Sequence, residues 1–146
     1  MSGFEFAEQM TGTIEWDDKP GVTYPFRFEV RAHARSLRDH AMTGRADLEG
    51  IVHAPPFATA ADASGSIMIR PIGARVIKYE LAFRSDDGQR YELRGQKDIS
   101  WRHPLRTFTE LPAEVCDEGG RRVARCMTRF DLRHDGFSFL RSFRLV

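Results

Sequence analysis

Cysteine is scarce in this chain of 146 residues: only Cys116 and Cys126 are present, and their spacing is neither that of a metal site nor a CxxC redox motif. We expect two free thiols, with a cross-strand disulfide as the alternative because the two residues flank a predicted turn. No run approaches the roughly 18 apolar residues of a membrane-spanning helix. Residues 1–6 lack the basic segment and apolar core of a signal peptide. These features predict a cytoplasmic protein without a membrane span.

Lysine is also scarce, since only three of the 22 basic residues are Lys and the rest are Arg. Arginine is favoured where a cation lies on an aromatic ring or holds a carboxylate or phosphate with two hydrogen bonds. A GC-rich genome also replaces Lys with Arg. Because the net charge of +1 does not distinguish these two explanations, the role of the arginines stays open.

Several catalytic signatures are missing. There is no Gly-x-Ser-x-Gly elbow and no phosphate-binding glycine loop. None of the five histidines has a second His or a Cys at metal-ligand spacing, so we expect no metal and no cofactor. His103, before Pro104 in a predicted loop, is the histidine best placed to act near neutral pH, although most lone loop histidines have no such role.

What the sequence has in abundance is alternation of apolar and polar residues, which is typical of half-buried strands. The clearest example is 26–32, where Phe, Phe, Val and Ala alternate with Arg, Glu and Arg. The segments 77–83 and 91–95 follow the same pattern. Asp87-Gly88 between them is a strong hairpin signal.

The pattern predicts a single domain over 1–146. It is all-β, one antiparallel barrel of about eight to nine strands of lipocalin or calycin type. One short helix is expected at 36–42, with Ser36 as its N-cap and Gly44 after its end. The stretch 54–63 is predicted to be a loop. Strands are expected at 4–16, 25–33, 45–53, 64–71, 75–85, 89–99, 106–115, 121–133 and 137–146.

Two cationic residues interrupt the apolar faces of predicted strands. Lys97 continues the inward series of Tyr91 and Leu93, and Arg141 shares a face with Phe137 and Phe139. An inward charge needs a carboxylate, a carbonyl or a ligand as its partner. Alternatively, a bulge at a glycine such as the one at position 95 reverses the register, and both residues are then ordinary solvated charges or structural ion pairs.

A row of arginines marks the eighth predicted strand. Arg121, Arg125, Arg129 and Arg133 lie on one outward face, which is a pattern that could bind a polyanion. The stacking aromatic residues expected between them are missing. A solvated face paired with Glu and Asp is the alternative, and it makes nucleic acid an unlikely partner.

Short motifs over most of the chain resemble a known family. In order they are Met10-Thr11-Gly12, Gly65-Ser66, residues 79–83, Asp87-Gly88, and residues 91–97 followed by Trp101 and 107–111. The chain resembles the small β domain that accompanies bacterial glucose–methanol–choline oxidoreductases of the cholesterol-oxidase type and α/β-hydrolase modules. The segment between Lys97 and Trp101 is shorter than in that pattern, and Phe108 interrupts its Thr triplet. The resemblance implies a link to lipid or sterol metabolism and no transferable catalytic residue.

Three functions follow from these observations. The first is a carrier or accessory domain that binds a hydrophobic or amphipathic small molecule, with a redox enzyme or a hydrolase as its protein partner. The second is a barrel enzyme of isomerase, cyclase or hydrolase type in which Lys97 or His103 transfers a proton, although Asp98 points away from Lys97. The third is a nucleic-acid-binding barrel that uses the arginine row. The residues expected to hold the ligand are Lys97, Arg141, Tyr79, Tyr91, Trp101, Phe137 and Phe139.

Overall fold

The computed structural model describes residues 4–34, 44–70, 75–100, 102–103, 107, 109–130 and 144–145. Within these ranges the chain forms nine strands that belong to one sheet. The strands are β1 (Phe4–Trp16), β2 (Thr23–Ala34), β3 (Arg45–Ala54), β4 (Ala58–Arg70), β5 (Val76–Arg84), β6 (Arg90–Asp98), β7 (Glu110–Asp117), β8 (Arg122–Arg129) and β9 (Arg144–Leu145).

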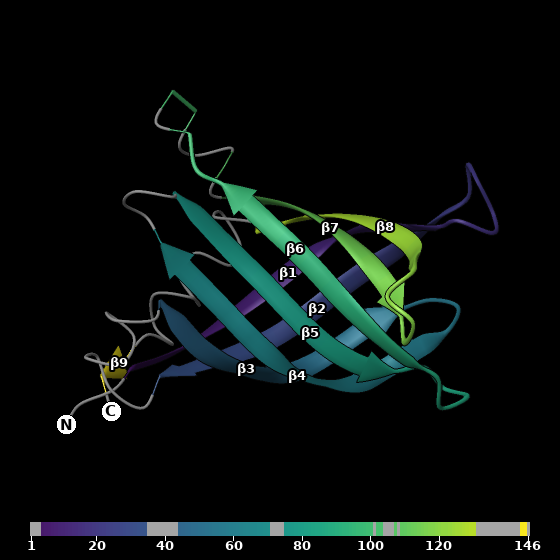
Figure 1. The fold of residues 1–146 in the computed structure, drawn as a ribbon, viewed down its shortest axis with the longest axis horizontal. Coiled ribbons are helices and arrows are strands. Elements are labelled where there is room, and N and C mark those ends of the chain that lie inside the picture. The colour runs from purple at the N-terminus through teal and green to yellow at the C-terminus, as the bar shows by residue number, and fades with distance from the viewer. Residues whose placement is uncertain are drawn as a thin grey trace.

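The sheet closes on itself. Each strand from β1 to β8 pairs antiparallel with the next, and β1 also pairs with β8 through residues such as Thr11 and Arg129. The two residues of β9 pair with Phe4 and Glu5 at the start of β1. Figure 1 shows the resulting barrel, with β9 beside the start of β1. The predicted all-β antiparallel barrel is confirmed.

The two ends of the barrel differ. At one end, here called the hairpin end, tight turns follow β1, β3, β5 and β7 (Figure 1). Gly88 and Gly120 in two of these turns have φ of +89° and +84°, a conformation that glycine adopts without steric cost. The hairpin predicted at Asp87-Gly88 is therefore confirmed. At the opposite end the strands are joined through 35–43, 71–74 and 99–109.

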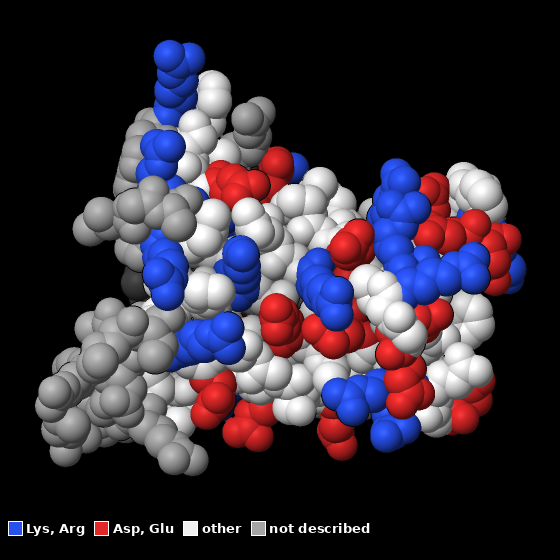
Figure 2. Space-filling model, in the orientation of Figure 1, with Lys and Arg blue, Asp and Glu red and all other residues white. Residues whose placement is uncertain are grey.

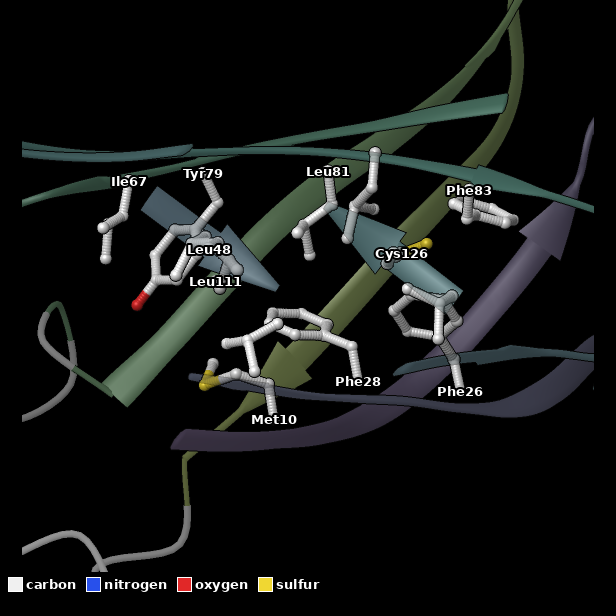
Figure 3. Packing of buried hydrophobic residues seen from close by; sticks show 14 of the residues in the cluster. Met10, Phe26, Phe28, Leu48, Ile67, Tyr79, Leu81, Phe83, Leu111 and Cys126 are labelled. Atoms are coloured by element: carbon white, nitrogen blue, oxygen red, sulfur yellow. The ribbon is translucent and has the colours of Figure 1, made fainter. Parts of the chain in front are cut away.

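Alternation along the strands sorts side chains between the interior and the solvent. In β2 the side chains of Phe26, Phe28, Val30 and Ala32 are buried, as the pattern predicts. They join one continuous core to which all eight long strands contribute. Figure 3 shows part of this core, in which Phe28 faces Tyr79 with ring centroids 6.1 Å apart.

Glycines at interior positions allow the strands to bend. Gly12 lies so close to β8 that an added Cβ would overlap the carbonyl oxygen of Met127. Gly50 and Gly65 approach the backbones of β2 and β5 in the same way. Glycine in a strand often marks a place where another backbone approaches closely, and designed barrels use it where the sheet curls. These glycines therefore support closure rather than ligand chemistry.

Some predicted boundaries differ from the structure. Strand β4 begins at Ala58, within the predicted loop 54–63, because pairing with β3 overrides the weak strand propensity of its alanines. Strand β7 begins at Glu110 rather than 106, since the Thr107 amide donates instead to the His103 carbonyl. The predicted helix 36–42 lies outside the described residues, as does most of the predicted strand 137–146. No helix among the residues described is long and apolar enough to cross a bilayer.

Candidate functional site

Lys97 points into the barrel. Its side chain is 4% exposed, and Leu93 on the same face of β6 is fully buried. Between them Gly95 pairs regularly with Tyr79 of β5 and Ala113 of β7, so no bulge reverses the register. The structure therefore supports the inward orientation of Lys97 and not a solvated one, while the ion pair that the alternative also allowed is present.

The partner of Lys97 is Glu8 on β1. The ammonium Nζ lies 3.5 Å from Glu8 Oε1, and the Glu8 side chain is only 7% exposed. Our sequence analysis missed this residue. Glu8 lies two positions from Phe6 and two from Met10, both of which face inward, so the alternation along β1 places Glu8 inside as well. The carboxylate that an inward lysine requires is thus present across the barrel.

Tyr79 on β5 completes a buried polar cluster. Its hydroxyl lies 3.0 Å from both carboxylate oxygens of Glu8 and donates to that carboxylate. The Lys97 ammonium also lies 5.3 Å from the centroid of the Tyr79 ring, within reach of a cation–π interaction. Burial, reinforced by the charge of Glu8 and the hydrogen bond to it, raises the pKa of Tyr79 well above its ordinary value. The phenol is therefore protonated and acts as a donor at neutral pH.

These three residues, called the Glu8 cluster below, combine donors and an acceptor inside an apolar wall. Glu8 accepts hydrogen bonds, Lys97 donates them, and Tyr79 holds the carboxylate in place. No side-chain nitrogen or oxygen buried in the described part of the chain lacks a hydrogen-bond partner. The cluster can present both an acceptor and a donor to a polar group of a bound molecule.

The other predicted site residues are separated from this cluster or lie outside the described ranges. Tyr91 is at the hairpin end, where its ring lies 5.9 Å from Trp16 and its hydroxyl donates to Gln89 Oε1 at 3.1 Å. His103 is exposed to solvent. The residues outside the described ranges are Trp101, Phe137, Phe139 and Arg141. Of the seven predicted ligand residues, the structure brings together Lys97 and Tyr79.

Interior side chains close the hairpin end. Trp16 packs edge-on against Phe57 with ring centroids 4.6 Å apart, and its indole nitrogen donates to the Pro55 carbonyl at 2.9 Å. In Figure 3 Phe26 and Phe83 occupy the same side of the view, whereas the Tyr79 hydroxyl points the other way. The Tyr79 hydroxyl of the Glu8 cluster therefore points away from the hairpin end.

Small residues gather on the wall next to Glu8. Across β2, β3 and β4 the interior positions near this end include the buried alanines 32, 34, 46 and 63 and the glycine at position 50. By register, Glu8 opposes Val30, which opposes Gly50 in turn. Small residues therefore lie next to Glu8 on this wall, and the hairpin end also holds buried alanines, at positions 54 and 58.

Two open grooves lie on the outer surface. One, of about 820 Å³, crosses β1 to β4 and is lined by outward side chains such as Gln9, Glu29 and Asp62 together with Glu8 and Gly50. The other, of about 790 Å³, crosses β5 to β8, reaches β1 at Thr13, and includes Lys78, Arg94 and Tyr79. Both grooves carry charges of both signs and are open to solvent.

In the described part of the chain, acidic residues lie beside two members of the arginine row. Arg129 lies 3.0 Å from Glu110, and Arg125 stands opposite Glu15 on one side and Glu114 on the other. Arg121 is also exposed, and Arg133 lies outside the described residues. Over β5 and β6, Figure 2 likewise shows Lys and Arg interspersed with Asp and Glu. This mixed surface favours the solvated alternative over a polyanion site.

The two cysteines are buried free thiols. Cys126 stands opposite Ala113 and Cys116 opposite Arg122, so the two are not cross-strand neighbours. Burial raises the pKa of both thiols. The expectation of free thiols is confirmed.

Comparison with known proteins gives no match: no family model fits this chain, and no curated protein is significantly similar to it. In the part of the chain that the structure describes, no group of three His, Cys, Asp or Glu side chains could hold a metal ion. The functional argument therefore rests on the Glu8 cluster and its place in the barrel.

Proposed function

We propose that this barrel is a cytoplasmic carrier or accessory domain that binds a hydrophobic or amphipathic small molecule. The polar part of the ligand contacts the Glu8 cluster, and its apolar part lies along the interior wall at the same end. Tyr79 and Lys97 keep their predicted roles, and Glu8 joins them.

The observation that carries this proposal is the ion pair of Glu8 and Lys97 inside an apolar barrel. Removing two charges from water costs several kcal/mol per ion, and replacing such a pair with well-packed apolar residues is often neutral or stabilising. Stability alone therefore gives little reason to keep the pair. A few convergent polar groups in an otherwise apolar concave wall are typical of small-molecule sites.

Two further observations support the proposal. The interior neighbours of Glu8 along the register, Val30 and Gly50, are medium-sized or small. The resemblance to the small β domain of cholesterol-oxidase-like oxidoreductases and hydrolase modules suggests a lipid or sterol as the ligand and such an enzyme as the partner.

The test is native mass spectrometry of protein purified from cells, with extraction of any bound molecule, followed by titration with the neutral hydrophobic probe N-phenyl-1-naphthylamine. We expect either a co-purifying lipid-like molecule or saturable probe binding that Lys97→Met weakens. A clean apo mass together with no probe binding would contradict the proposal. So would a probe affinity that Lys97→Met and Tyr79→Phe both leave unchanged.

A second candidate function is proton transfer on a carbonyl substrate. The observation that favours it is Glu8, which gives Lys97 the acid–base partner that Asp98 cannot provide. Glu8 would remove a proton from the carbon next to the carbonyl and return it after rearrangement. Incubation with 2-decanone in D₂O should then exchange the α-hydrogens faster with the wild type than with Glu8→Gln. Equal rates for the two proteins would eliminate this candidate.

A further inference from the structure

The outer surface of β7, β8, β1 and β2 carries an uncharged row of side chains. Cross-strand register aligns Pro112, Met127, Thr13 and Pro25 in this row, and all four are exposed to solvent. Met127 is 49% exposed and, in the described part of the chain, is one of two exposed large hydrophobic residues. Methionine and arginine are enriched at protein interfaces relative to the rest of the surface. The row and its surroundings are therefore a candidate contact surface.

A charged row lies on each side of the uncharged one. In strand order from β7 to β2, the first row holds Glu114, Arg125, Glu15 and Thr23, and the second holds Glu110, Arg129, Thr11 and Arg27. Along β8 these positions alternate with buried side chains, so they point outward. The three rows together are called the β8–β1 face below.

Arg125 lies at the middle of this face and is exposed. Its cross-strand neighbours are Glu15 and Glu114, but Arg125 takes part in none of the ion pairs within the described residues. One carboxylate oxygen of Glu15 accepts from the Gly21 amide at 3.1 Å. The Arg125 guanidinium can therefore contact a carboxylate outside its own chain.

A two-fold axis along the strands, between β8 and β1, brings two such faces together with matching charges. It places β8 of one copy over β1 of the other and β7 over β2, so each row meets its own counterpart. Arg125 then faces Glu15 of the second copy, and Glu110 faces Arg27. The other facing pairs are Met127 with Thr13, Arg129 with Thr11, Glu114 with Thr23 and Pro112 with Pro25. Within these three rows no two like charges face each other.

We infer that the β8–β1 face docks a second copy of this chain in a two-fold dimer. A two-fold contact uses the same patch on both subunits, so the patch must be complementary to itself. The register provides this complementarity, and sheets that pack face to face commonly keep their strands nearly aligned. The mixture of charges that argues against a polyanion thus fits a second copy. The inference is independent of any ligand inside the barrel, because the face lies on the outside of the wall.

Sedimentation velocity of the full chain tests this dimer. At low salt we expect a species of twice the chain's mass, and high salt should shift it toward the monomer because salt screens exposed charges. Arg125→Glu should raise the dissociation constant at least about a hundredfold, since two symmetry-related attractions become repulsions. Glu15→Arg should have the same effect for the same reason.

Mixing these two variants separates a contact between copies from a change within one chain. Arg125→Glu and Glu15→Arg carry opposite charges at the facing positions, so the mixture should form a dimer that neither variant forms alone. Lys78→Glu is the matched control, because Lys78 is exposed on β5 outside the face and the same charge reversal there should leave the dimer intact. A wild-type chain that stays monomeric, a dimer that Arg125→Glu leaves intact, or a mixture that stays monomeric would overturn the inference.

Discussion

Replacing Lys97 with methionine tests the central electrostatic argument. The substitution keeps most of the side-chain volume but leaves the carboxylate of Glu8 buried without its ammonium. With an effective dielectric constant of about 20, two unit charges 3.5 Å apart attract each other by about 5 kcal/mol. This value agrees with the loss of about 3–5 kcal/mol seen when one member of a buried pair is removed. We expect Lys97→Met to lower the free energy of unfolding by that amount.

Equilibrium unfolding in urea, followed by tryptophan fluorescence, measures this loss. With a slope of about 2 kcal/mol per molar urea, the midpoint should fall by about 2 M. The double variant Glu8→Gln/Lys97→Met leaves no unpaired charge, so it should recover most of the loss. Lys78→Met on β5 is a matched control because Lys78 is exposed, and it should change stability by less than about 0.5 kcal/mol. Two results would refute the argument. One is a Lys97→Met variant as stable as the wild type, and the other is a double variant no more stable than Lys97→Met alone.

Three further predictions concern the barrel around the site. Trp16→Ala should destabilise the fold by about 3–5 kcal/mol in the same urea assay, because it empties the aromatic packing of the hairpin end; a loss below about 1 kcal/mol would contradict this. Gly12→Ala should lower the free energy of unfolding by about 3 kcal/mol, because the added Cβ would overlap the Met127 carbonyl. An unchanged midpoint of thermal unfolding would show that the methyl group is tolerated and would contradict this prediction. Cys116 and Cys126 should react with Ellman's reagent at pH 8 far more slowly in the folded protein than in urea, because burial and a raised pKa keep them protonated. Rapid labelling of the native protein would show that the thiols are accessible.

Much of the fold could be predicted because alternation is a local signal. Residues 26–32 show in sequence which side chains point inward, and Asp87-Gly88 marks a turn by its own chemistry. The start of β4 could not be predicted in this way. Alanine has little preference for strands, and only the pairing of Ala58–Arg70 with two neighbouring strands makes this segment extended.

The candidate site was half predictable for a related reason. The alternation of inward and outward side chains along β6 placed Lys97 inside, where its charge requires a partner. The same alternation along β1 would have placed Glu8 inside as well. What parity cannot show is that residues 89 positions apart meet, because that depends on how the sheet closes. Tyr91 shares the parity of Lys97, yet it lies at the other end of the strand and contributes to the hairpin end instead.

Closure of the sheet through β1 and β8 has a consequence for how the chain folds. Thr11 must find Arg129, and this contact joins segments separated by nearly the whole described chain. Pairing over such a distance costs loop entropy before it gains stability, which is why proteins dominated by distant pairings fold in milliseconds to seconds. Until β8 docks, β1 and β7 each present an unpaired edge, and such edges recruit other chains. We therefore expect a chain truncated after Asp117 to aggregate rather than to persist as a smaller barrel.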